Sequence, residues 1–289
     1  MKISEIIKNE TPSLSFEVFP PKSVDGFETI KTATEEIAKL KPSFISVTYG
    51  AGGSTSKYTL EIAENIEKNY NVPTLAHLTC VSSSESEIEQ KVKAITSKNV
   101  KNILALRGDI PENSNVSSWD FSHASDLVRK IKEIDSSVCV GGACYPEIHP
   151  ESRNQKDDIK YLKEKVEAGC EFLTTQMFFD NNLLYNFLYK IREAGINVPI
   201  IAGIMPITNA NQIERAIKLS GSFIPQRFKS LVDKFGSNPL SMKQAGIAYA
   251  TDQIIDLYAN GINNVHVYTM NKPDVAQKIQ SNLSEILGK

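Results

Sequence analysis

The feature of this sequence that most constrains its fold is a repeated alternation between short apolar segments and longer amphipathic ones. Eight short segments have the length and composition of buried β-strands, at residues 14–19, 44–49, 74–79, 102–106, 138–145, 172–178, 199–204 and 264–269. The segments between them carry apolar residues at helical spacing, as Phe27, Ile30 and Ile37 do within residues 26–40. This alternation predicts a parallel sheet covered by helices, an α/β architecture.

Eight strand–helix units in a chain of 289 residues are best accommodated when the sheet closes into a (β/α)8 TIM barrel. An open, doubly wound sheet is the alternative. After the seventh strand the spacing lengthens, and residues 209–220, 225–235 and 240–260 are predicted to be extra helices between strands seven and eight. Because no composition shift or repeat marks a linker, residues 1–289 are predicted to form a single domain.

Composition narrows the class of protein. A formal net charge of −2 and the lack of a Lys/Arg block argue against nucleic-acid binding. The most apolar stretch, residues 198–207, is interrupted by two prolines and is too short to span a membrane. The first residues contain no apolar signal segment, and the four cysteines form no C-x-x-C pair. We therefore expect a cytoplasmic protein with buried thiols.

Residues 102–111, NILALRGDIP, form an apolar run that stops abruptly at Arg107, Gly108 and Asp109. This pattern is typical of a buried strand whose last residues enter a cleft. The same tripeptide is a cell-adhesion motif, which would need a secreted chain and an exposed loop. The preceding apolar strand and the expected cytoplasmic setting favour a cleft.

In a barrel of this kind, functional groups gather at the carboxyl ends of the strands. Glu17 lies there at the end of the first strand, between Phe16 and Val18. An unpaired carboxylate in that position is costly to desolvate. Two interpretations remain open, a salt-bridged structural residue and a general acid whose pKa is raised by apolar surroundings.

The other strand ends add hydrogen-bonding and aromatic groups. Gly50, Gly52 and Gly53 after the second strand could cradle an anion, although they do not match the dinucleotide pattern. No His-x-His or carboxylate–Lys pattern of a metal-dependent hydrolase is present, so a planar, polar-edged ligand is favoured over a metal ion. The rival is a metal-dependent barrel enzyme, whose ligands would be Glu17, His77, Asp109 and His149.

The ordered motifs FEVFPPK, VTYGAGGS, AHLTC, NILALRGDIP, YPEIHPES, GIMP and HVYTMN, together with Gln176-x-Phe178-Phe179-Asp180, resemble those of bacterial methylenetetrahydrofolate reductases. The resemblance covers nearly the whole chain. It implies a flavin-dependent barrel enzyme that reduces 5,10-methylenetetrahydrofolate to 5-methyltetrahydrofolate with NADH or NADPH. The product supplies methyl groups for methionine synthesis. Members of the family form dimers or tetramers, so a homo-oligomer is expected.

Carried over residue by residue, the resemblance implies an FAD site built from several strand ends. Its members would be Thr48, Tyr49, Ala51, His77, Arg107, Gly108, Asp109, Ala124, Tyr145, His149, Asp158 and Lys165. Asp109 corresponds to an aspartate that lies near both the flavin and the folate pterin. A carboxylate there disfavours an anionic reduced flavin, which should lower the reduction potential.

Glu17 corresponds to the catalytic glutamate of the family. The methylene bridge of the folate must open to an iminium before it accepts hydride, and a protonated carboxylic acid can supply the proton that opening requires. The resemblance also implies substrate contacts by Gln176, Gln212, Tyr268 and Lys272.

Two positions depart from the family pattern. Lys272 replaces an arginine that is common in bacterial relatives, and it keeps the charge but loses bidentate recognition of a carboxylate. Ala216 lies where some relatives carry an aromatic residue that packs against bound ligands. Neither departure touches the predicted acid or the predicted FAD site.

Overall fold

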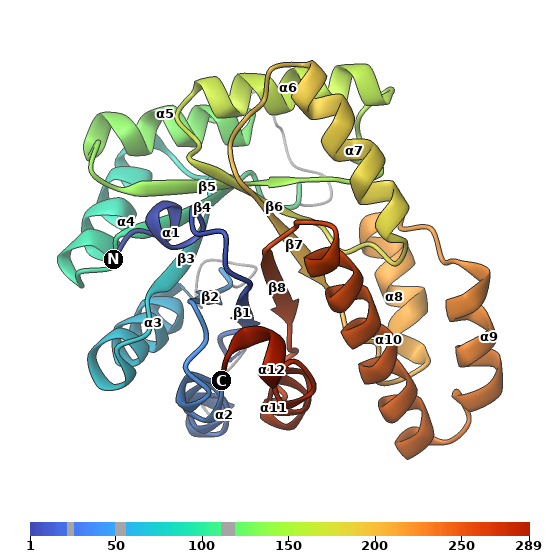
Figure 1. The fold of residues 1–289 in the computed structure, drawn as a ribbon. Coiled ribbons are helices and arrows are strands. Elements are labelled where there is room, and N and C mark those ends of the chain that lie inside the picture. The colour runs from blue at the N-terminus through green and yellow to red at the C-terminus, as the bar shows by residue number, and fades with distance from the viewer. Residues whose placement is uncertain (22–25, 50–55, 111–118) are drawn as a thin grey trace.

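The computed structural model describes residues 1–21, 26–49, 56–110 and 119–289. Within these residues eight parallel strands close into a barrel in chain order, and β8 pairs with β1 (Figure 1). The strands are β1 (Ser13–Val18), β2 (Ile45–Val47), β3 (Thr74–Thr79), β4 (Asn102–Leu106), β5 (Cys139–Cys144), β6 (Phe172–Thr175), β7 (Ile200–Ile204) and β8 (Asn264–Tyr268). The predicted TIM barrel is confirmed, and the open sheet is excluded.

Helices surround the barrel and bury its outer face (Figure 1). The main apolar core lies between the two layers and joins Val47 of β2 to Ile37 and Ile62 of the helices outside it. The described helices are α1 (Ile3–Ile6), α2 (Phe27–Lys39), α3 (Ser56–Tyr70), α4 (Glu85–Ser97), α5 (Ala124–Ile134), α6 (Gln155–Glu167), α7 (Asn181–Glu193), α8 (Asn211–Ser220), α9 (Gln226–Phe235), α10 (Pro239–Ala259), α11 (Pro273–Asn282) and α12 (Ser284–Leu287). Strands covered in this way are buried on both faces, which explains their continuous apolar sequences.

Helix α1 closes the N-terminal end of the barrel. Its residue Ile3 packs with inward-facing apolar side chains such as Phe44 and Phe172. The buried side chain of Asn102, at the start of β4, accepts a hydrogen bond from the Ile3 N–H at 2.8 Å and donates one to the Thr74 carbonyl at 3.0 Å. This end of the barrel is therefore filled, and open space lies toward the opposite end.

Helices α8, α9 and α10 lie together on one side of the barrel, between β7 and β8 in the chain (Figure 1, orange). They share their own apolar cluster, in which the ring of Phe228 stacks on that of Phe179 at 5.2 Å and also contacts Tyr249. The predicted extra helices between strands seven and eight are confirmed. Their packing brings α8 to the rim of the barrel.

Of the predicted strands, the second and sixth differ most from the structure, and each is three residues shorter than expected. The second covers Ile45–Val47 instead of residues 44–49, and the sixth ends at Thr175 instead of 178. After Thr175, the Met177 N–H bonds the side chain of Gln176, and the carbonyls of Phe178 and Phe179 accept hydrogen bonds from side chains of α10. The backbone of residues 177–179 thus finds partners other than a neighbouring strand.

Several local expectations are confirmed. Ser84 caps α4, because its hydroxyl accepts from the Glu87 N–H while the Glu87 carboxylate accepts from the Ser84 N–H. All four cysteines are free and buried.

No described helix is long and apolar enough to cross a membrane. The assignment of residues 1–289 to one domain stays a prediction.

Candidate active site

A cavity of about 490 Å³ opens among the carboxyl ends of the strands. A volume of this size suits a small organic molecule. The residues predicted for function that line it are Glu17, Thr48, His77, Asp109, Gln176, Gln212 and Tyr268, and Ala216 lines it too. The structure therefore brings together side chains from six strand ends and from α8, which are spread over some 250 residues of sequence.

A second cavity, of about 390 Å³, adjoins the first. The predicted residues that line it are Arg107, Gly108, Asp109, Ala124, Tyr145, His149, Asp158 and Lys165. Leu106, Asp109, Ala143 and Gln176 line both cavities. Asp109 therefore lies where a ligand of one cavity meets a ligand of the other.

Two of the predicted residues that the structure describes, Tyr49 and Lys272, are not among those that line either cavity. The ring of Tyr49 packs against the outer core, with the Lys91 Nζ 5.6 Å from its centroid. The Lys272 Nζ donates to the Thr208 hydroxyl at 2.8 Å, and Gln212 Oε1 accepts from the backbone N–H of the same threonine, so Lys272 lies close to the cavity through Thr208. Ala51 lies outside the described residues.

Glu17 projects from β1 into the barrel and is almost completely buried. Its neighbours in strand register are Ser46 on β2 and Tyr268 on β8. Burial raises the pKa of the Glu17 carboxyl group from its ordinary value to about 8. At neutral pH the side chain is therefore mostly a protonated carboxylic acid, the form that a general acid requires.

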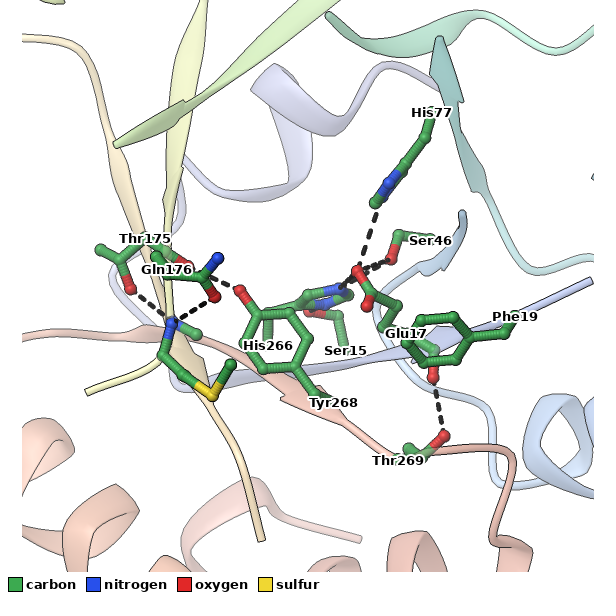
Figure 2. A network of polar contacts seen from close by, with 12 residues as sticks. Ser15, Glu17, Phe19, Ser46, His77, Thr175, Gln176, His266, Tyr268 and Thr269 are labelled. Atoms are coloured by element: carbon green, nitrogen blue, oxygen red, sulfur yellow. Dashed lines mark hydrogen bonds and ion pairs between the residues drawn. The ribbon is translucent and has the colours of Figure 1, made fainter. Parts of the chain in front are cut away.

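Two buried histidines face Glu17. The Nε2 atoms of His77 and His266 lie 3.6 and 3.9 Å from Glu17 Oε2 (Figure 2). Burial lowers the pKa of each imidazole to about 3, so both rings are neutral at physiological pH. Neither ring therefore forms a charged pair with the glutamate. His77 Nε2 has no hydrogen-bond partner among the described residues, and its ring lines the cavity.

A row of hydrogen bonds connects Glu17 to the interior of the barrel. Ser46 Oγ lies 3.3 Å from Glu17 Oε2 and 2.8 Å from His266 Nε2, and His266 Nδ1 lies 2.8 Å from Ser15 Oγ (Figure 2). Ser15, Ser46 and His266 were not predicted to belong to the site. The period-two alternation of Ser15 with Glu17 and of His266 with Tyr268 was a readable signal, but the register between strands was not.

The hydroxyl group of Tyr268 is held in place by the backbone of Thr175 and Gly203. Its hydroxyl donates to the Thr175 carbonyl at 2.6 Å (Figure 2). A Cβ atom at Gly203 would lie 2.3 Å from this hydroxyl oxygen, so glycine is needed there. Burial raises the pKa of Tyr268 well above its ordinary value, which leaves a neutral phenol beside Glu17.

The second cavity has the groups that bind a nucleotide diphosphate. Arg107 and Lys165 bring positive charge, and Ala124 and Ser125 bring the N-terminus of α5. The Lys165 Nζ donates to the Ala143 carbonyl at 2.7 Å, and burial lowers the pKa of its ammonium group, so an anionic partner would stabilise the charge. Gly108 has a φ of 91°, and a Cβ there would lie 2.7 Å from the Val81 side chain. These residues fit the phosphates of FAD.

Arg107 has a protein partner that the sequence did not reveal. Its guanidinium group donates two hydrogen bonds of 2.6 Å to the two oxygens of Glu151. This hydrogen bonding raises the pKa of Arg107 and lowers that of Glu151. The pair joins the end of β4 to the segment after β5 across the mouth of the second cavity.

The rival set of metal ligands does not converge. Within residues 1–21, 26–49, 56–110 and 119–289, no three His, Cys, Asp or Glu side chains are grouped to hold a metal ion. Glu17 and His77 line the first cavity, whereas His149 lines the second.

Comparison with known proteins identifies the family to which this site belongs. Residues 2–284 match the family profile described as methylenetetrahydrofolate reductase. The 5,10-methylenetetrahydrofolate reductase of Escherichia coli (strain K12) is 32% identical over 268 residues, which cover 92% of this chain and 89% of that protein. The chain belongs to the methylenetetrahydrofolate reductase family.

Relatives with longer chains are also similar. Methylenetetrahydrofolate reductase (NADH) 1 of Arabidopsis thaliana is 34% identical over 298 residues, which cover 99% of this chain. The match takes in only 50% of the plant protein, so the chain spans about half the length of such relatives. Among solved structures, an uncharacterized protein from Clostridium thermocellum that binds two copies of 5-methyl-5,6,7,8-tetrahydrofolic acid superposes with a TM-score of 0.73 over 98% of both chains. At 16% identity this likeness concerns the fold.

Proposed function

We propose that this protein reduces 5,10-methylenetetrahydrofolate to 5-methyltetrahydrofolate with NADH or NADPH, and that FAD is its cofactor. Membership of the family supports the reaction, and the two adjoining cavities support the two ligands. The observation that carries the proposal is Glu17, a buried carboxyl group that keeps its proton near neutral pH at the wall of the larger cavity. The product would supply methyl groups for methionine synthesis.

In this proposal the second cavity holds the diphosphate part of FAD. Arg107, Lys165 and the N-terminus of α5 would bind the phosphates, and the positive-φ backbone at Gly108 lets the chain pass close to the cofactor. When bound there, FAD would supply the hydride-transfer chemistry between the nicotinamide and the folate. Asp109 and Gln176, which line both cavities, would position the pterin against the cofactor.

Glu17 would supply the proton that opens the methylene bridge. The departing folate nitrogen must be protonated before the one-carbon unit becomes an iminium that can accept hydride. The Glu17 carboxylic acid donates that proton, and its burial keeps bulk water from competing for it. Gln212 and Tyr268 line the same cavity and would orient the folate. Lys272, which is hydrogen-bonded to Thr208, would contact the folate tail.

The test separates the folate step from the nicotinamide step. Purified protein supplied with FAD should produce 5-methyltetrahydrofolate under anaerobic conditions with NADH or with NADPH, as followed by chromatography. Glu17→Gln should lower folate reduction by about 100-fold or more, because general acids contribute roughly that much. The same variant should still oxidise the nicotinamide with an artificial electron acceptor.

The matched control is Glu36→Gln on the exposed face of α2, which should behave as wild type. If the wild-type protein forms no product with either nicotinamide, the proposed function is wrong. If Glu17→Gln reduces folate at close to the wild-type rate, Glu17 is not the acid.

A further inference from the structure

Four polar side chains inside the barrel form a continuous row that ends at the catalytic acid. Ser15 and Glu17 come from β1, Ser46 from β2 and His266 from β8 (Figure 2). Strand register aligns Ser15 with His266 and Glu17 with Ser46. We propose that His266 is a positioning residue that, by taking the hydroxyl proton of Ser46, keeps the proton on Glu17. Only the catalytic consequence of this proposal rests on the proposed function; the effect of His266 on the protonation of Glu17 does not.

Ser15 lies at the end of the row farthest from Glu17. The Ser15 hydroxyl lies 3.0 Å from the Val265 carbonyl, which can only accept, so the single Ser15 hydrogen is donated there. Ser15 Oγ also lies 2.8 Å from His266 Nδ1. Because the serine hydrogen is already used, the serine oxygen must accept, and the hydrogen of this second bond must belong to Nδ1.

The tautomer of His266 follows. Burial lowers the pKa of the ring to about 3, so it carries one hydrogen at neutral pH. That hydrogen is on Nδ1, and Nε2 therefore has a free lone pair. Ser46 Oγ lies 2.8 Å from this Nε2 and must donate to it. The ring is held in place by Phe44, which stacks on it at 5.2 Å with an angle of 12° between the planes.

The direction of the hydrogen bond between Ser46 and Glu17 follows from the His266 tautomer. Ser46 has given its hydrogen to His266, so only its oxygen lone pair faces Glu17 Oε2 at 3.3 Å. A lone pair repels a carboxylate and accepts from a carboxylic acid. A Ser46 hydroxyl that donated to Glu17 would favour the ionised form and lower its pKa. Because His266 takes the Ser46 hydrogen, Ser46 cannot donate to Glu17. The protonated form of Glu17 instead donates a hydrogen bond to Ser46 Oγ.

The other groups around Glu17 leave this arrangement undisturbed. His77 on β3 is a neutral ring with its Nε2 at 3.6 Å, and Tyr268 on β8 is a neutral phenol that donates to the Thr175 carbonyl. Asp109, after β4, lines the same cavity and brings a carboxylate. No Lys or Arg is among the described residues that line this cavity, so no cation there stabilises ionised Glu17.

The row can hold a proton but cannot deliver one. It ends at the Val265 carbonyl inside the barrel, which has no hydrogen to pass on. After Glu17 has given its proton to the substrate, it must be protonated again from the cavity side.

The test measures the Glu17 titration directly in the protein as purified, by NMR of carboxyl groups labelled with ¹³C-glutamate, and it requires no turnover. In His266→Phe the aromatic ring can still stack on Phe44, but Ser46 is free to donate to Glu17. We expect the midpoint of the Glu17 titration to fall by about one to two pH units, the usual effect of a hydrogen bond to a charged group. A midpoint that stays unchanged or rises overturns the proposal.

Two further variants keep the test decisive. In the double variant His266→Phe with Ser46→Ala, the midpoint should return close to the wild-type value, because the hydroxyl that favoured ionisation is gone. A midpoint that stays low means that Ser46 did not cause the fall, and overturns the proposal. Ser46→Ala alone should not raise the midpoint. A rise would show that Ser46 donates to Glu17 in the native protein.

The tautomer of His266 can be measured in the wild-type protein. The chain contains four histidines, so ¹⁵N signals of the rings can be assigned through single variants. We expect His266 to carry its hydrogen on Nδ1 from pH 6 to 9, and a hydrogen on Nε2 overturns the proposal. These measurements stand whether or not the protein reduces folate, so failure of the proposed function is distinguishable from failure of this inference.

Discussion

Among the residues that the structure describes, no carboxylate is hydrogen-bonded to the Lys165 ammonium group, which lies beside the second cavity. Its Nζ donates to the Ala143 carbonyl, and burial lowers its pKa, so the charge is only partly compensated by the protein. We predict that Lys165→Met weakens FAD binding about 10- to 100-fold, because a charge-assisted hydrogen bond to phosphate is lost. Fluorescence titration of the apoprotein with FAD measures the change.

The control for this prediction is Lys163→Met, which removes an exposed lysine from the same helix. Its affinity for FAD should equal that of the wild type. Equal losses in the two variants would assign the effect to net charge and count against a phosphate contact by Lys165.

Asp109 is the residue at which the two cavities meet. A negative charge close to the flavin opposes the gain of electrons, so Asp109→Asn should raise the reduction potential of bound FAD, on the order of tens of millivolts. Folate reduction should slow, since a flavin of higher potential is a weaker hydride donor. Spectroelectrochemical titration gives the potential, with the exposed Asp233→Asn on α9 as the control of equal charge. A potential that is unchanged or lower would refute this role of the carboxylate.

At the scale of elements, the short helix α1 closes the barrel, and the buried amide side chain of Asn102 is one of its anchors. Asn102 accepts from the Ile3 N–H and donates to the Thr74 carbonyl, and it is fully buried. Asn102→Ala would leave both backbone groups without these partners, and we predict a loss of about 2–4 kcal/mol in the free energy of unfolding. Urea denaturation measures it. Asn69→Ala on the exposed face of α3 should change the stability by less than about 0.5 kcal/mol.

Secondary structure was predictable wherever the local pattern matched what the tertiary structure required. The apolar run at residues 102–106 and the capping box at Ser84 depend on neighbours in sequence, and both were confirmed. The sixth strand was overextended because Met177 and Phe178 are apolar. The carbonyls of Phe178 and Phe179 accept from Gln253 and Tyr249, at least 70 residues away, which no local pattern reveals.

The same limit applies to the candidate site. Glu17 could be singled out from the sequence because a carboxylate among apolar residues is anomalous by itself. Ser46 looks unremarkable between Ile45 and Val47, and it gains meaning only from the register that aligns β1 with β2. Arg107 could be placed at the rim, but its bidentate partner Glu151 depends on how two loops meet in space.

For the whole molecule, the buried titratable groups of the site make stability depend on pH in opposite directions. His77 and His266 have folded pKa values near 3, below the ordinary value of 6.5, so stability is gained as pH rises through this range and levels off about one pH unit above 6.5. Glu17 has a folded pKa near 8, above the ordinary value of 4.5. The unfolded state ionises first, and stability is lost as pH rises from 4.5 to 8.

Between pH 6.5 and 8 the Glu17 contribution falls, and each histidine contribution rises by only about 0.4 kcal/mol as the unfolded imidazole loses its remaining proton. We predict that Glu17 alone lowers the free energy of unfolding by about 1.6 kcal/mol across this interval, since one proton corresponds to about 1.4 kcal/mol per pH unit and Glu17 is half ionised at pH 8. Glu17→Gln should abolish that fall, because an amide does not titrate. Urea unfolding at pH 6.5 and pH 8, at a fixed FAD concentration, measures the difference between the two proteins. If wild type and variant lose equal stability over this interval, Glu17 is already ionised in the folded protein, and the acid that the site provides would have to be sought in another group.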